Sequence, residues 1–104
     1  MDKNEALLLA QKYIDFISSR YHIKNAMLFG SFARGNQNSD SDIDVAVVID
    51  DSNDIIDTQI EMMKLRRSID LRIEPHPFLE EDFNNSNPVV SEILKNGISL
   101  QGNK

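Results

Sequence analysis

The chain has 104 residues, of which 40% are hydrophobic and 7% aromatic, as is typical of one globular domain with one core. It contains no cysteine and no apolar run long enough to cross a bilayer, and its N-terminus leads directly into a helical pattern, so we expect a single cytoplasmic domain over residues 1–104. The formal net charge of −6 argues against general affinity for a polynucleotide backbone, so we expect no direct nucleic-acid binding.

The first half of the chain predicts a helix, a buried strand and a second, short helix. Apolar residues recur at helical spacing from about Asn4 to Ser18, and Asn4 is the expected N-cap residue. The apolar run from Ala26 to Phe29 predicts the strand. A short helix near Phe32 to Arg34 follows, and Gly35 is expected to end it.

The middle of the chain predicts two more strands around another helix. After a polar loop from Asn36 to Ser41, alternation predicts a strand from about Asp42 to Ile49. The next helix carries three apolar residues on one face, namely Ile56, Ile60 and Met63. Alternation from Ser68 to Glu74 predicts a third strand with one polar face, which the two prolines that follow should end.

The last part of the chain completes a small two-layer fold. A turn of helix is expected from Leu79 to about Phe83, and a helix that Asn87 opens and Gly97 closes. Residues Ile98 to Leu100 are expected to add a short edge strand. This order of elements predicts an α+β fold, in which a mixed sheet of three to four strands carries helices on one face.

A phosphate-binding turn and a pair of carboxylates stand close together in the sequence. Gly30 and Ser31 break the first strand where a tight turn into a helix leaves backbone N–H groups pointing outward, an arrangement that attracts phosphate. Asp42 and Asp44 lie two residues apart on the second strand, so both side chains should face one side of the sheet. Their Cα atoms would lie roughly 6.6 Å apart, close enough to share a metal pair. Oxygen ligands alone favour Mg²⁺ or Mn²⁺.

The pattern Gly30-Ser31, ten residues, then Asp42-x-Asp44 closely resembles the signature of the polymerase-beta-like nucleotidyltransferase superfamily. The longer string GSFARG…SDSDIDVAVV is similar to its minimal nucleotidyltransferase branch. The resemblance implies the nucleotidyltransferase fold, ATP as substrate and two Mg²⁺ ions, with Mn²⁺ as an alternative. It also implies that Gly30 and Ser31 bind the triphosphate and that Asp42 and Asp44 hold metal.

The superfamily pattern implies a third carboxylate on a neighbouring strand, and Asp70 is our choice because Ile69-Asp70-Leu71 fits the hydrophobic–Asp–hydrophobic motif. Glu74 has the same facial parity but lies roughly 13 Å further along the strand, so only one of the two can face the metal pair. Arg34 either contacts phosphate or braces the acidic face. The two histidines, His22 and His76, are interpreted as structural.

Three functions are consistent with these features. The resemblance to antitoxins of two-gene systems implies an enzyme that transfers AMP from ATP to a tyrosine of a small helical HEPN ribonuclease toxin. A silent binding module that covers the basic surface of such a toxin is the alternative from another class. The third is a small-molecule nucleotidyltransferase, as in the antibiotic-modifying relatives. Those relatives generally carry a further domain, so this function would need a homodimer to build the pocket.

Overall fold

The computed structural model describes residues 1–38 and 40–100; Ser39, in the predicted polar loop, and residues 101–104 of the predicted domain lie outside the described part. The elements follow one another in chain order as α1 (Lys3–Ile17), β1 (Ile23–Phe29), α2 (Ser31–Arg34), β2 (Ile43–Ile49), α3 (Ile55–Leu65), η1 (Arg66–Ser68), β3 (Ile73–Leu79), η2 (Glu80–Asp82), α4 (Pro88–Asn96) and β4 (Ile98–Ser99).

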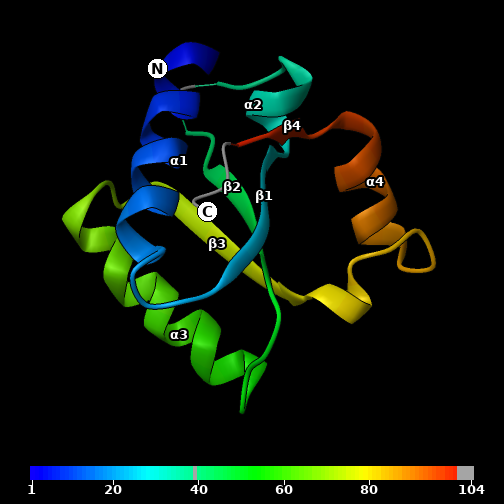
Figure 1. Ribbon diagram of the computed structural model, residues 1–104. Coiled ribbons are helices and arrows are strands. Elements are labelled where there is room, and N and C mark those ends of the chain that lie inside the picture. Colours follow the sequence, from blue (N-terminus) through cyan, green and yellow to red (C-terminus); the bar gives the residue numbers. More distant parts are fainter. Residues whose placement is uncertain (39, 101–104) are drawn as a thin grey trace.

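The four strands form one mixed sheet in the order β3-β2-β1-β4 (Figure 1). β1 is antiparallel to β2 and to β4, whereas β2 and β3 run parallel. The predicted α+β fold with a small mixed sheet is therefore confirmed.

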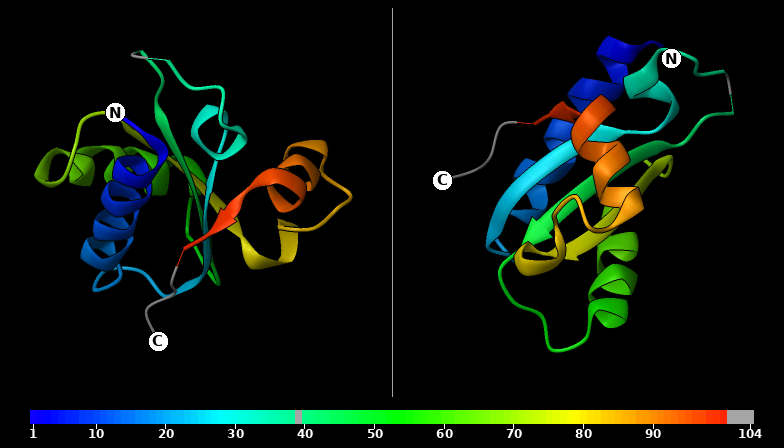
Figure 2. Two further views of the ribbon diagram at one scale, coloured as in Figure 1. Left: turned by 90° about the horizontal axis from the view of Figure 1, so that it is seen from above. Right: turned by 90° about the vertical axis from the view of Figure 1, so that its right-hand side faces the viewer.

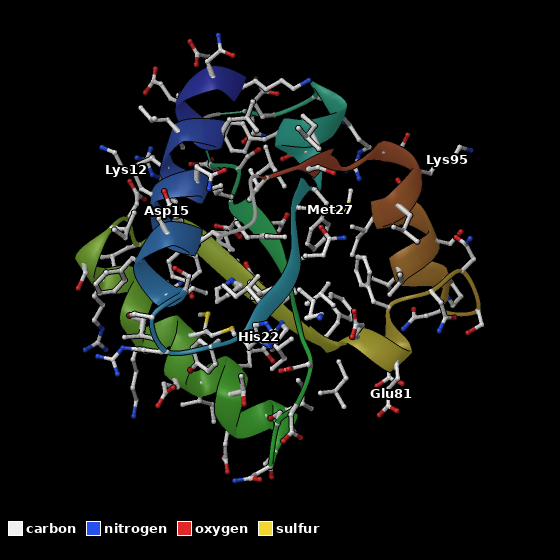
Figure 3. The ribbon with its side chains drawn as sticks, viewed as in Figure 1. Lys12, Asp15, His22, Met27, Glu81 and Lys95 are labelled. Atoms are coloured by element: carbon white, nitrogen blue, oxygen red, sulfur yellow. The ribbon has the colours of Figure 1, made fainter. Side chains whose placement is uncertain are left out.

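Each face of the sheet has its own hydrophobic cluster. Alternate strand residues such as Leu28, Val45 and Val47 are fully buried on the face that α1 and α3 cover. Met27 and Ala46 have the opposite parity and pack with Ile93 of α4 in a smaller cluster. Figure 2 shows α4 on the other side of the strands from α1 and α3, and Figure 3 shows Met27 between β1 and α4. We predicted all helices on one face of the sheet, whereas α4 lies on the face opposite α1 and α3.

Local capping signals set most of the helix ends. Gly35 ends α2 with a left-handed backbone (φ 79°), as predicted. The side chain of Asn87 accepts hydrogen bonds from the first backbone N–H groups of α4, also as predicted. The predicted N-cap of α1 is wrong: the cap is Asp2, which accepts a hydrogen bond from the backbone N–H of Glu5, so Asn4 lies inside the helix.

The three apolar residues predicted to share one face of α3 lie at the surface and outside the core. Ile56 and Ile60 are 66% and 49% exposed, and together with Met63 they line a groove that also includes Glu74. Met62 is fully buried instead, and the buried hydroxyl of Tyr13 in α1 donates to its carbonyl at 2.7 Å. This hydrogen bond ties α1 to α3.

The predicted third strand is displaced along the chain. β3 begins at Ile73 and continues through Pro75 and Pro77, which the sequence had placed at its end. β3 lies at the edge of the sheet, and the Pro75 carbonyl accepts a hydrogen bond from Gln59 of α3 at 3.3 Å, so this side of the backbone faces away from β2. A proline at such a position removes no hydrogen bond from the ladder.

Candidate functional site

The bend after β1 lies directly against a carboxylate of β2. Gly30 has a backbone conformation (φ 76°, ψ −151°) that side chains rarely adopt, and α2 begins at the next residue, Ser31. A Cβ atom added to Gly30 would lie 2.3 Å from Oδ2 of Asp44. Glycine is therefore required at this position both for the turn and for the close approach of Asp44.

Strand register brings a third carboxylate beside the Asp-x-Asp pair. Asp44 pairs with Glu74 across the parallel strands β2 and β3, so the two side chains lie on the same face. Asp42, which comes just before β2, lies close enough to Glu74 to raise the pKa of the Glu74 carboxyl. The structure thus brings Asp42, Asp44 and Glu74 together at the end of the sheet where β1 turns into α2.

The charges of this group act on one another. Partial burial raises the pKa of Glu74, and the hydrogen bond with Asp42 and the negative charges of Asp44 and Asp42 raise it further, while His76 lowers it. Mutual repulsion of this kind is what a bound cation relieves.

Asp70, our choice from the sequence, occupies a different place. It lies in the turn before β3, where both of its carboxylate oxygens bind Arg72, at 2.9 Å from Nε and 2.7 Å from Nη2. Its Oδ1 also accepts a hydrogen bond from the backbone N–H of Arg72 at 2.8 Å. These hydrogen bonds hold the pKa of Asp70 below its usual range. Asp70 thus closes a turn, and Glu74 occupies the position next to Asp44.

His76, which the sequence led us to interpret as structural, lies beside these carboxylates. Its imidazole Nε2 lies 3.2 Å from Oδ1 of Asp44, and one donor atom from each of Asp44, Glu74 and His76 lies within 4.8 Å of the others. The signal was the alternation Glu74-Pro75-His76-Pro77, in which both polar residues share one parity, but the prolines argued against a strand. His22 lies at the other end of β1, where its Nδ1 is 2.6 Å from Oδ2 of Asp50 (Figure 3).

A pocket of about 490 Å³ opens beside Asp44. Its lining combines the bend, apolar side chains and three charged groups, namely Phe29, Gly30, Arg34, Asp44, Pro88, Val89, Glu92 and Ile93. Nη1 of Arg34 lies 3.9 Å from Oε1 of Glu92, and both side chains are about half exposed. The pocket therefore places an apolar wall and one cation next to the carboxylates.

Two comparisons of sequence bear on this arrangement. Residues 11–104 match the family described as Polymerase beta, Nucleotidyltransferase. The Putative protein adenylyltransferase MJ1379 of Methanocaldococcus jannaschii is 40% identical over 45 residues, which are 43% of this chain and 45% of that protein. The match thus spans less than half the length of that relative. Among the described residues, the helices lack the length and apolar character that a membrane span requires.

Solved structures share the fold. A crystal structure of a putative nucleotidyltransferase from Sulfolobus solfataricus has a TM-score of 0.66 at 21% identity, covering 93% of this chain and 80% of that one. The toxin-antitoxin MntA-HepT has a TM-score of 0.61 at 22% identity, covering 92% and 72%. A toxin-antitoxin with AMP-PNP has a TM-score of 0.59 at 23% identity, covering 100% and 76%. At these identities the likeness shows the fold, while the sequence match shows the family. The chain belongs to the polymerase beta nucleotidyltransferase family.

Proposed function

We propose that this domain transfers AMP from ATP to a hydroxyl of a partner protein, with divalent metal bound at the carboxylates. The observation that carries the proposal is the meeting of three elements at one end of the sheet: the Gly30 bend, the pair Asp42 and Asp44, and Glu74 of the neighbouring strand. We propose the cytoplasm as the compartment of this protein, which is consistent with ATP as its substrate.

The donor set fits a divalent cation. Carboxylate oxygens of Asp44 and Glu74 lie within 4.8 Å of each other, and Asp42 is close enough to raise the pKa of Glu74. We propose Asp42, Asp44 and Glu74 as the residues that hold Mg²⁺ or Mn²⁺; Asp70 remains the alternative third carboxylate. Bound there, the metal would neutralise charge on the phosphates and lower the pKa of the attacking hydroxyl.

The chain's own residues would then orient the nucleotide. We propose that the backbone N–H groups and hydroxyl of the Gly30-Ser31 bend, which lies against Asp44, bind the triphosphate. Arg34 would contact a phosphate oxygen, and the apolar wall of the pocket, formed by Phe29 and Val89 among others, would hold the base or ribose. In the transfer, a bond forms between the acceptor oxygen and the α-phosphorus, the bond from that phosphorus to pyrophosphate breaks, and the hydroxyl proton passes to water.

We propose that the acceptor comes from a second chain, a small helical protein of the HEPN type. The name of the archaeal relative, a putative protein adenylyltransferase, favours a protein acceptor, and the toxin-antitoxin structures that share the fold favour a toxin. The Asp42 side of the site is open to solvent, because Asp42 is exposed while Asp44 is half-buried. An acceptor hydroxyl can therefore approach from this side.

The test uses ATP labelled at either the α- or the γ-phosphate. The purified protein is incubated with each nucleotide, Mg²⁺ or Mn²⁺, and a small helical protein encoded beside it, and the label on the partner is counted. AMP transfer should move the α-label to the partner and release the γ-label in pyrophosphate. Label from both nucleotides would contradict AMP transfer, as would no label from either.

Matched variants separate catalysis from binding alone. Asp42→Asn combined with Asp44→Asn should abolish labelling, whereas Asp50→Asn, an exposed aspartate that pairs with His22 away from the site, should not. A tight complex with the partner that carries no label, and that forms equally well with the double variant, would instead favour a silent binding module.

A further inference from the structure

The position of His76 brings a nitrogen donor to a site so far described by its carboxylates. Its Nε2 lies 3.2 Å from Oδ1 of Asp44 and 4.0 Å from Oε1 of Glu74. The side chains of His76, Asp44 and Glu74 are 30%, 25% and 40% exposed, respectively. The imidazole is therefore partly shielded, but an ion can still reach it from solvent. Three potential metal-binding groups thus converge from two strands.

Several features of the fold hold this imidazole in place. His76 lies two residues after Glu74 on β3, so both side chains leave the same face of the sheet. Its register partner on β2 is Ala46, a residue too small to obstruct the ring. The ring packs edge-on against Phe29, with the ring centres 5.0 Å apart. A ligand that is oriented before the ion arrives loses less conformational freedom when it binds.

We propose that His76 is a metal ligand, and that its nitrogen makes this site favour transition-metal ions such as Mn²⁺ over Mg²⁺. The inference rests on the metal site of the proposed function. Mg²⁺ takes oxygen ligands and keeps much of its water, whereas first-row transition ions accept imidazole readily. A site of two or three carboxylates and one imidazole therefore discriminates between these ions. A site made of carboxylates alone discriminates between them far less.

The experiment detects the nitrogen directly, without nucleotide or partner. Mn²⁺ is added to the purified protein, and pulsed electron paramagnetic resonance measures the coupling of its electron spin to ¹⁴N. The wild-type protein should show the coupling of a directly bound imidazole, and His76→Asn should lose it. His22→Asn is the matched control, because His22 pairs with Asp50 at the opposite end of β1 and should leave the signal unchanged.

Affinities measured on the same samples test the selectivity. His76→Asn should weaken Mn²⁺ binding at least about tenfold. Losses of this size are typical even when the removed residue only hydrogen-bonds to a metal ligand. The affinity for Mg²⁺, measured by competition with Mn²⁺, should change much less. His76→Gln provides a second variant, and thermal unfolding of each variant checks that a lost signal does not come from a lost fold.

Two outcomes would overturn the inference. Mn²⁺ bound without ¹⁴N coupling would show that His76 orients Asp44 without touching the ion, and an equal loss of Mn²⁺ and Mg²⁺ affinity in His76→Asn would remove the selectivity. Neither outcome would contradict AMP transfer, which the labelling experiment tests separately. Conversely, nitrogen coupling in a protein that labels no partner would overturn the transfer and leave the role of His76 intact.

Discussion

Replacing Gly30 by alanine tests how closely the bend and the carboxylate depend on each other. The new methyl group would lie 2.3 Å from Oδ2 of Asp44, which is closer than real Cβ atoms approach other groups, and 3.2 Å from its Cγ, which is a tight contact. Asp44 would have to turn away from the bend and from His76, whose Nε2 now lies 3.2 Å from Oδ1. The substitution should therefore damage both the fold and the binding of metal.

The size of the effect on stability follows from the backbone and the contact together. The conformation of Gly30 (φ 76°, ψ −151°) costs a residue with a side chain about 1–3 kcal/mol. For a domain of this size, 1 kcal/mol corresponds to a shift in Tm of roughly 4–8 °C, so Gly30→Ala should lower Tm by about 10 °C. Displacement of Asp44 should also weaken Mn²⁺ binding at least about tenfold.

Gly35→Ala is the matched control, because Gly35 also has a positive φ (79°) but, among the described residues, nothing lies within 4 Å of an added Cβ. It should lose only the cost of a left-handed residue, about 1–2 kcal/mol, and should bind Mn²⁺ as the wild type does. Circular dichroism during heating measures Tm, and electron paramagnetic resonance of free Mn²⁺ measures binding. Equal Mn²⁺ affinity in the two variants would refute the claim that Gly30 is kept for Asp44.

Three further predictions concern single side chains. Measured by calorimetry, Glu74→Gln should weaken Mn²⁺ binding at least about tenfold, whereas Asp70→Asn should leave it unchanged. The reverse result would make Asp70 the third carboxylate. Asp70→Asn should lower the free energy of unfolding near neutral pH, because Arg72 holds the pKa of Asp70 below its usual range. That difference from wild type should shrink as the pH falls through the lowered pKa, and a difference independent of pH would refute the pairing as its cause. Tyr13→Phe should cost about 1–2 kcal/mol in urea denaturation, because the Met62 carbonyl loses its buried donor; an unchanged midpoint would show that this carbonyl finds another.

The part of the site that could be predicted is the part that is local in sequence. Gly30 follows the apolar run of β1 directly, and Asp42 and Asp44 are two residues apart at the start of β2. That Asp42 and Asp44 share one side of the sheet follows from strand parity alone, which needs no knowledge of the other strands. Helix ends at Gly35 and Asn87 were predictable for the same reason, since a cap acts within one turn.

The third strand could not be placed in this way, because its register depends on contacts with β2. Ile69, Asp70 and Leu71 alternate as a strand would, yet Asp70 bonds to Arg72 two residues later and closes a turn, and Leu71 is 65% exposed. The prolines of β3 were misleading as well, since their cost depends on whether the strand is at an edge. Only the register of β3 on β2 puts Glu74 and His76 beside Asp44.

The charges of the site explain why nucleotide and metal should bind it together. Partial burial raises the pKa of Glu74, and the neighbouring Asp42 and Asp44 raise it further; a triphosphate brought alone to the Gly30 bend would meet the same negative charges. Arg34 offers one positive charge in the pocket, and Glu92 lies 3.9 Å from it. A divalent ion reverses both effects, because it neutralises the carboxylates and attracts the phosphates. From the acidic character of the chain we therefore expect the metal–nucleotide complex to bind more tightly than free nucleotide.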